Sequence, residues 1–329
     1  MNKMKFFTRI AFLAIVLPLA MTSCNKINDE EVSNNQKVEI HLSSGGEVMF
    51  RSASTGTDTQ IPVGEKVMVY VDETGGAVNL YQKNILTADG TGHLIGGPET
   101  IMYFPTSGNN VDIYALHTNA AFPVSNPVAY PTTPLIHAVS GDQTTLAGYE
   151  SSDLLYAKET NVAKTSNSVL LTFYHLLSKL QVAVEAGTGL TAGDIAGITI
   201  NGTNLQATFT LNKATAPNQV SVGAAGTAAS PIKIGADVSP DFYDGDIQYN
   251  DAIIVPQTLD AGTVFITVQL VKGGNLVYRL PAATTFVSGK KYEYRIVANL
   301  GGLTLTTIVK DWEPVGYVTG EAVQDDSSL

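Results

Sequence analysis

The run TVFITVQLV, residues 263–271, shows the pattern that decides the fold class. Val264, Ile266, Val268 and Leu270 alternate with other residues, so a β-strand would place all four side chains on one face. Gly-Gly, Asp-Gly and Asn-Gly turn signals separate such runs, and no stretch keeps a helical spacing for long. Many short strands joined by polar turns predict an all-β protein built of β-sandwiches. The other strand-like runs are residues 38–42, 66–72, 111–116, 168–174, 179–184, 195–200, 205–211, 276–280, 292–297 and 303–309.

Two segments interrupt this rhythm of strands and turns. Residues 118–148 contain four prolines and little alternation, which predicts a long irregular loop. Residues 175–180, HLLSKL, could form a single helical turn after the preceding strand. We place a domain boundary near Ser178, which gives an N-terminal β-sandwich domain of residues 38–178 and a C-terminal one of residues 179–329.

The N-terminus has the features of an export signal. Basic residues before position 10 precede an uncharged apolar run, residues 10–21, which is too short to span a bilayer comfortably as a helix. Small residues then lead to Cys24, the only cysteine, and this placement resembles a bacterial lipobox. We therefore predict that residues 1–23 are a lipoprotein signal peptide and that Cys24 is acylated, for example with palmitate. A plain signal peptide that happens to contain a cysteine is the alternative.

A polar segment follows the predicted lipid attachment site. Residues 24–37 have almost no apolar content, so we expect a flexible tether. Its acidic run, residues 29–31, is either a solvated linker or a surface-export tag like those of surface lipoproteins in Bacteroides-like bacteria. Because no second cysteine exists, no internal disulfide can form, and the fold must depend on its core.

The charge balance excludes several kinds of partner. The formal net charge is −11, from 19 basic and 30 acidic residues, and charged residues make up only 15% of the chain. Such an acidic protein is not expected to bind nucleic acid, nor anionic lipid by charge.

Motifs that would indicate catalysis are missing from the sequence. It contains no HExxH, GxSxG, Walker A or CxxC pattern. The five histidines lack the spacing of metal ligands, so each is expected to be a satisfied or an exposed side chain. The aspartates of residues 241–251 do not follow the spacing of a calcium loop, which favours a solvated acidic loop over an adventitious Ca²⁺ site. We predict a protein that is not an enzyme and needs no cofactor or metal. The residues considered are His41, His93, His117, His137, His175, Asp241, Asp244, Asp246 and Asp251.

Two motifs resemble those of a known family. Residues 173–184, FYHLLSKLQVAV, are similar to a segment of the fimbrillins of Bacteroides-like bacteria. Residues 286–297, FVSGKKYEYRIV, and 303–312, LTLTTIVKDW, are similar to the ending of the same proteins. The resemblance implies two tandem transthyretin-like β-sandwich domains, export as a lipoprotein, proteolytic cleavage after an arginine near the N-terminus, and assembly into pili by strand exchange.

The resemblance also directs attention to particular residues. The candidate cleavage site is Arg51–Ser52 in VMFRSAS, where the family more often has Thr-Arg-Ala. Residues 38–51 would then be a removable edge strand of the first domain; the alternative is an ordinary strand followed by a loop. Near the C-terminus, Val315, Tyr317 and Val318 form a short β-prone stretch that is the candidate donor strand.

The predicted function is that of a structural subunit of a cell-surface fimbrium that contributes to adhesion. Its partners would be other pilus subunits, the outer membrane through the lipid anchor before maturation, and a maturation protease. It would be located first at the outer membrane and cell surface and then in the extracellular fimbrium. Two alternatives stay open: a tip or anchor subunit of the same pilus, and a monomeric surface lipoprotein that binds glycan or host protein.

Overall fold

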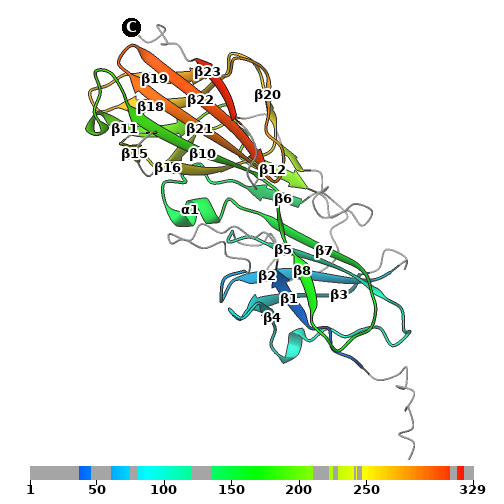
Figure 1. Ribbon diagram of the computed structural model, residues 1–329. Helices are drawn as coiled ribbons and strands as arrows, with labels where there is room; N and C mark the ends of the chain where they lie inside the picture. Colours follow the sequence, from blue (N-terminus) through cyan, green and yellow to red (C-terminus); the bar gives the residue numbers. More distant parts are fainter. Residues whose placement is uncertain are drawn as a thin grey trace, which may run out of the picture. The chain divides into compact units, whose positions relative to one another are not determined.

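The computed structural model describes residues 37–45, 61–74, 80–120, 135–209, 222–224, 229–240, 242, 247–311 and 317–321, and these are nearly all β-structure (Figure 1). All of them belong to the unit that begins at Lys37. Among the described residues, the helical elements are two 3-10 turns, η1 (Pro98–Thr100) and η2 (Ala192–Asp194), and one short helix, α1 (Leu146–Glu150). The all-β prediction is therefore confirmed. In this part of the chain no helix is long and apolar enough to cross a membrane.

An eight-stranded sheet contains the strands from the N-terminal half of the chain. Strands β8 and β9 lie at its opposite ends, yet only Phe173 separates them in the sequence. All neighbours are antiparallel except β1 and β8, which run parallel. In their order across the sheet, the strands are β8 (Val169–Thr172), β1 (Leu42–Gly45), β4 (His93–Ile95), β3 (Leu80–Ala88), β2 (Lys66–Glu73), β5 (Val111–His117), β7 (Leu155–Val162) and β9 (Tyr174–His175).

Strand β2 shows how the sequence pattern becomes a core. Val67, Val69 and Val71 are fully buried on one face, as their alternation predicts, and belong to the hydrophobic core of this sheet. Met68 and Tyr70 on the other face are also buried, at 1% exposure each, and contribute to the second core of the protein. A strand buried on both faces in this way is central to its sheet.

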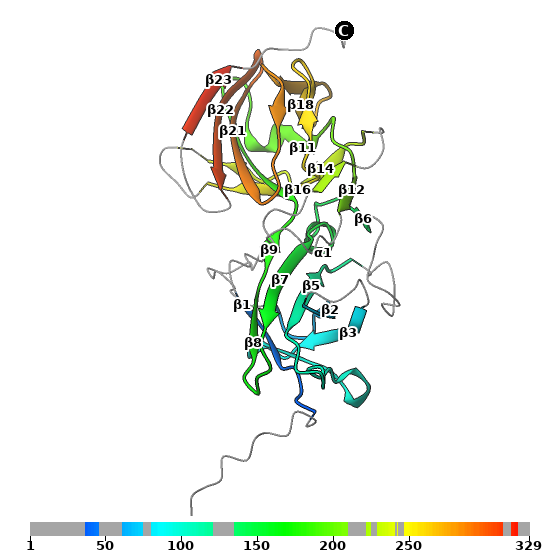
Figure 2. The ribbon, with the colours of Figure 1, turned by 90° about the vertical axis from the view of Figure 1, so that its right-hand side faces the viewer.

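The remaining strands form four smaller sheets, and the two largest of these pack face to face (Figures 1 and 2). In the six-stranded sheet the order is β15 (Val238–Ser239), β10 (Ser178–Ala186), β21 (Lys290–Asn299), β22 (Gly302–Asp311) and β23 (Tyr317–Glu321), with β16 (Tyr249–Ile254) also paired to β10. The four-stranded sheet has the order β14 (Ile232–Ile234), β11 (Ile195–Ile200), β18 (Val264–Leu270) and β19 (Asn275–Arg279). The short sheets are β13 (Val222–Ala224), β12 (Gln206–Phe209) and β6 (Leu135–Ala138), and β17 (Thr258–Leu259) with β20 (Thr284–Thr285).

The core between the two larger sheets is rich in aromatic rings. Phe265 of β18 stacks on Phe286 with ring centroids 5.1 Å apart, and Phe286 meets Tyr292 of β21 edge-on at 4.9 Å. Phe265 reaches this core because the pairing of β18 with β19 shifts register between Val264 and Ile266. Of the predicted buried face, Ile266 and Val268 are fully buried in this core, and Val264 and Leu270 at the two ends of β18 are half-buried.

Two predictions about irregular segments are wrong. Residues 175–180 are not a helical turn, because His175 ends β9 and Ser178 begins β10. Residues 118–148 are not one irregular loop either, since β6 and the start of α1 lie within them. β6 became a strand because β12 offers it a partner, with Phe209 opposite Leu135. Residues 121–134, with all four prolines, lie outside the described residues.

Elements from before and after Ser178 also contact each other. Strand β6 pairs with β12, and the side chain of Gln143 both donates to Ile253 O (2.9 Å) and accepts from Ile253 N (2.8 Å). The segment that leads into α1 is thereby joined to β16. The division into two domains near Ser178 stays a prediction.

Candidate functional site

Strand β1 has an interior place in its sheet. It lies between β4, to which it is antiparallel, and β8, to which it is parallel, with Leu42 opposite both Leu94 and Val169. Residues 38–51 were predicted to supply an edge strand, and for β1 this is wrong. The cause is non-local, because β8 comes more than a hundred residues later in the sequence and supplies the second neighbour.

Backbone hydrogen bonds fix both sides of residues 38–45. On one side Ile40 N donates to Met102 O and Phe104 N donates to Val38 O, each at 2.8 Å. Further along the same side, Ser44 N donates to Gly92 O at 2.7 Å. Residues 38–45 therefore have two successive neighbours on this side, first residues 102–104 and then β4. On the other side, Val169 N, in the first residue of β8, donates to His41 O at 2.8 Å.

Alternate side chains of this segment cover the core of the eight-stranded sheet. Ile40, Leu42 and Ser44 are 5%, 1% and 3% exposed, whereas His41 is exposed. Ile40 and Leu42 belong to the same hydrophobic cluster as Val69 of β2. Removing the segment would uncover this cluster and would leave the backbone groups of two strands without partners.

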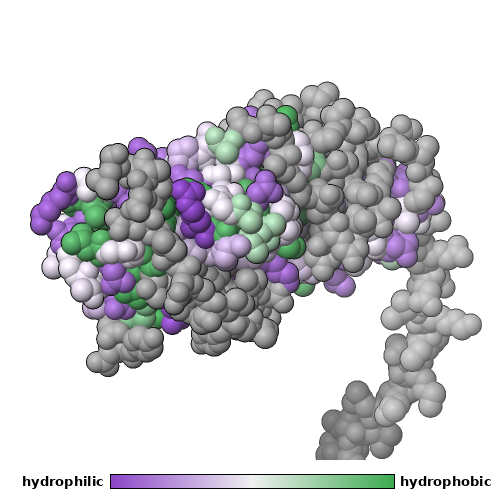
Figure 3. Space-filling model, turned by 90° about the horizontal axis from the view of Figure 1, so that it is seen from above, coloured by the Kyte–Doolittle hydropathy of each residue, from purple (hydrophilic) through white to green (hydrophobic). Residues whose placement is uncertain are grey.

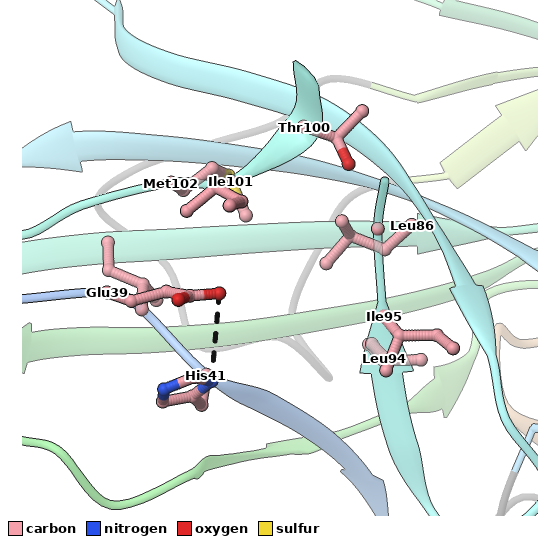
Figure 4. A pocket seen from close by; sticks show the side chains of 10 residues that line it. Glu39, His41, Leu86, Leu94, Ile95, Thr100, Ile101 and Met102 are labelled. Carbon is pink, nitrogen blue, oxygen red and sulfur yellow. Dashed lines mark ion pairs between the residues drawn. The ribbon is translucent and has the colours of Figure 1, made fainter. Parts of the chain in front are cut away.

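A small pocket with mixed polar and apolar walls lies beside residues 39–41, between β4 and residues 102–104 (Figure 4). Its volume is about 120 Å³, and η1 with the residues before it fills the interval between β4 and residues 102–104. Glu39 and His41 form the polar side of the pocket, with 3.9 Å between Oε1 and Nδ1. The lining residues are Glu39, Ile40, His41, Leu86, Leu94, Ile95, Gly96, Thr100, Ile101 and Met102.

The surroundings of β1 fit a structural role and not the binding of a small ligand or a metal ion. The pocket is well below the roughly 300–1,000 Å³ of ordinary ligand sites. Within the described ranges, no group of three or more His, Cys, Asp or Glu residues is arranged to hold a metal ion. Three exposed apolar side chains adjoin β1: Ile95 and Ile101 line the pocket, and Leu170 lies opposite Ser43. In the view of Figure 3, hydrophobic patches lie among hydrophilic ones on the described surface.

A second polar cluster surrounds the turn between α1 and β7. His175 Nδ1 lies 2.7 Å from Asp153 Oδ2, and His137 Nε2 lies 2.9 Å from Ser152 O. Burial is the main cause that lowers the pKa values of His137 and His117, and Asp153 opposes this shift in both. For Asp153 burial alone would raise the pKa, but the charge and hydrogen bond of His175 outweigh burial and hold it below its usual value.

This histidine cluster was not predicted, because the five histidines are far apart in the sequence. Three of them come from β5, β6 and β9, and only the fold brings them near one turn. Asp251 was also assigned wrongly to a solvated loop. It lies on β16, where its Oδ2 pairs with Lys179 Nζ at 3.0 Å. The other aspartates of that predicted loop lie outside the described residues.

Most of the predicted processing and donor residues also lie outside the described residues. These are Cys24, Arg51, Ser52 and Val315. Tyr317 and Val318 belong to β23, the last strand of the six-stranded sheet in the described chain, and lie opposite Ile308 and Thr307 of β22. Tyr317 and Val318 thus belong to a different sheet from β1.

The fold and the site together define a class of protein. An all-β chain whose first strand is built into its core, and whose polar clusters make internal hydrogen bonds, has the features of a structural or binding protein. The chain belongs to the fimbrillin-like family, whose family model matches residues 51–312. This is a family of fimbrial structural subunits and not of enzymes.

Individual relatives agree with this assignment. The chain is 25% identical over 297 residues to "Putative fimbrium subunit Fim1C" of Bacteroides uniformis, which covers 87% of this chain and 89% of the relative. Two crystal structures, each described as a "putative cell adhesion protein", share the fold. The one from Bacteroides uniformis has a TM-score of 0.60 and 21% identity, and covers 83% of this chain and 99% of its own. The one from Bacteroides ovatus has a TM-score of 0.61 and 18% identity, and covers 86% and 99%.

Proposed function

We propose that this chain is a fimbrium subunit that polymerises by exchanging residues 38–51 for a strand of another subunit. The observation that carries the proposal is the place of β1, hydrogen-bonded on both sides and covering a hydrophobic core. Its loss would open a groove between β4 and β8 with an apolar floor. A strand from a second molecule would restore both the backbone hydrogen bonds and the burial.

The energetics favour refilling such a groove. Ile40 and Leu42 are almost fully buried, and each is worth roughly 1.5–3 kcal/mol when removed from water. The two open strand edges add backbone groups that must find new partners. Because the groove and the incoming strand are different surfaces, the contact is heterologous and continues from subunit to subunit.

The proposed route to this state begins with export. Acylation of Cys24 anchors the precursor in the outer membrane, and cleavage between Arg51 and Ser52 then separates residues 24–51 from the body. The lipid anchor and β1 lie on the same fragment, so one cut both releases the subunit from the membrane and frees the groove. Arg51 is also the first residue matched by the family model, so β1 lies outside the matched part of the chain.

The C-terminal segment is the proposed donor. Val315, Tyr317 and Val318 lie beyond residue 312, where the family match ends. The described part of this segment, β23, pairs with β22 and has no second neighbour among the strands that the structure describes. In the groove the segment would have residues 102–104 and β4 on one side and β8 on the other, which gives a physical reason for the exchange.

The proposal is tested in a cell that builds the polymer. We expect Arg51→Ala to accumulate as an uncleaved, membrane-bound monomer, and truncation after Trp312 to be cleaved but not to polymerise. Lys272→Ala is the matched control, because its side chain is 88% exposed and remote in sequence from both segments. Ladders of high-mass species on gels and filaments in electron micrographs measure assembly. Normal filaments from both variants would overturn the strand-exchange proposal.

A further inference from the structure

The position of Ser44 in the core of the eight-stranded sheet is unusual, because the other buried side chains of this segment are apolar. Ser44 is 3% exposed, and its hydroxyl lies between two backbone groups. Ser44 Oγ accepts a hydrogen bond from Ile61 N and donates one to Gly92 O, each at 3.4 Å. Any strand that takes the place of β1 must supply a hydroxyl here, or it leaves a buried backbone N–H without this partner.

The next residue, Gly45, adds a weaker preference. A Cβ atom at this position would come within 2.6 Å of Leu170 Cδ1 on the neighbouring strand β8. A larger residue would make the Leu170 side chain move, and because Leu170 is exposed and its Cδ1 is the end of a flexible side chain, glycine is preferred here but not required. Together the two positions define a pattern for residues 40–45, IHLSSG: apolar, any, apolar, any, hydroxyl, glycine.

The C-terminal tail contains this pattern once. Residues 315–320 read VGYVTG, in which Val315, Tyr317 and Thr319 match the buried positions and Gly320 matches Gly45. The tail has two serines besides Thr319, Ser327 and Ser328, and both have an aspartate two positions earlier where the pattern needs an apolar side chain. Only Thr319 therefore satisfies the pattern within residues 313–329.

We infer that residues 315–320 of a second copy replace residues 40–45 in this one register, with Thr319 in the place of Ser44. The inference rests on the proposed strand exchange and adds its register and the residue that selects it. The strand enters in the direction of β1, parallel to β8 and antiparallel to β4. Val318 then takes the place of Ser43, opposite Leu170, whose exposed side chain it covers.

Engineered disulfides test the register directly. Leu170→Cys combined with Val318→Cys places the two thiols at opposite positions of neighbouring parallel strands, which lie about 4.8 Å apart, within the range of a disulfide. We expect covalent ladders between subunits that disappear on reduction. The matched control is Leu170→Cys combined with Thr319→Cys, which places the second thiol on the core face and should give no ladder. Covalent ladders from the control pair alone, or filaments without ladders from either pair, would overturn the register.

Substitutions at Thr319 test the hydroxyl requirement. Thr319→Val keeps the shape and removes the hydroxyl, so we expect roughly 5- to 100-fold weaker assembly, measured as the subunit concentration needed for polymer. Thr319→Ser restores the residue found in β1 and should assemble like the natural chain. Equal assembly by Thr319→Val and Thr319→Ser would overturn the requirement.

The outcomes separate this inference from the proposed function. If truncation after Trp312 abolishes polymer while the Leu170→Cys, Val318→Cys pair gives filaments without ladders, the donor assignment stands and the register is wrong. If the truncated chain assembles normally, the strand-exchange proposal itself fails for this segment.

Discussion

At the scale of single residues, Leu42 shows most clearly what β1 contributes. Its side chain is 1% exposed and belongs to a core that includes residues of six other strands, β2, β3, β4, β5, β7 and β8. The adjacent His41 lies on the opposite face and is exposed. Substitutions at Leu42 and at His41 can therefore distinguish the loss of a buried side chain from a change to the exposed face of the same strand.

We expect Leu42→Ala to lower the free energy of unfolding of the uncleaved protein by about 2–5 kcal/mol, because it leaves a cavity in a packed core. His41→Ala is the control and should change this free energy by no more than about 0.5 kcal/mol. Urea denaturation followed by circular dichroism measures both. Equal losses would mean that β1 does not cover the core as described.

The histidine cluster predicts how stability depends on pH. His117 and His137 have pKa values lowered by burial, so the unfolded chain takes up their protons more readily than the folded one. Their contribution is present above about pH 6.5 and is lost as pH falls through the lower, folded values. Asp153 also has a lowered pKa, but its contribution is lost only below about pH 4. The groups that influence the two histidines are Glu65, Asp153, His175 and the carbonyl groups of Lys66 and Ser152.

The free energy of unfolding should therefore fall between pH 7 and pH 5. Replacing His117 and His137 together by Gln should flatten this dependence, although it can lower the stability at pH 7. Urea titrations at pH 7.5, 6.5 and 5.5 give the slope. A variant with the slope of the natural protein would show that other groups cause the dependence.

At the scale of elements, the contact between Gln143 and β16 shows how a side chain can act as a strand neighbour. Its amide makes the same pair of hydrogen bonds with Ile253 that a peptide group of an adjacent strand would make. Gln143 is 1% exposed, so water cannot easily replace these bonds.

Gln143→Ala should lower the free energy of unfolding by about 2–4 kcal/mol, because two buried backbone groups lose their partner at about 1–3 kcal/mol each. The neighbouring exposed Thr144 supplies the control variant Thr144→Ala. Hydrogen exchange of the Ile253 amide gives a local measurement. Unchanged protection at Ile253 would contradict the assignment.

The same scale shows how much of the fold the sequence predicts. Strands β2 and β18 follow from alternation, because both have valines or isoleucines at every second position. The interior place of β1, the strand β6 and the cluster at His175 could not be predicted in this way. Each depends on a partner far away in the sequence, such as β8 for β1, and no local pattern specifies that pairing. The burial of Ser44 could have been predicted, because Ser44 continues the alternation of Ile40 and Leu42 by one more position.

At the scale of the whole molecule, the proposed attachment to the membrane depends on one atom, the Cys24 sulfur. We expect Cys24→Ala to move the uncleaved protein from the membrane fraction to the soluble fraction, because no other segment of the sequence predicts an anchor. Cell fractionation measures the partition, and mass spectrometry of the N-terminal peptide detects the acyl chains. Ser23→Ala is a control that keeps the cysteine. A Cys24→Ala protein that stays with the membrane would contradict the lipid anchor.

The mixed pairing of β1 has a consequence for the polymer. A strand that replaces β1 keeps the hydrogen-bond patterns of both neighbours when it runs in the same direction, since a reversed strand would be parallel to β4 and antiparallel to β8. Every subunit added by the proposed exchange would therefore point the same way, and the fimbrium would have two unlike ends. One end would present an open groove and the other a free tail. A subunit without the tail could occupy only the end at which its groove is filled, where it would stop further growth.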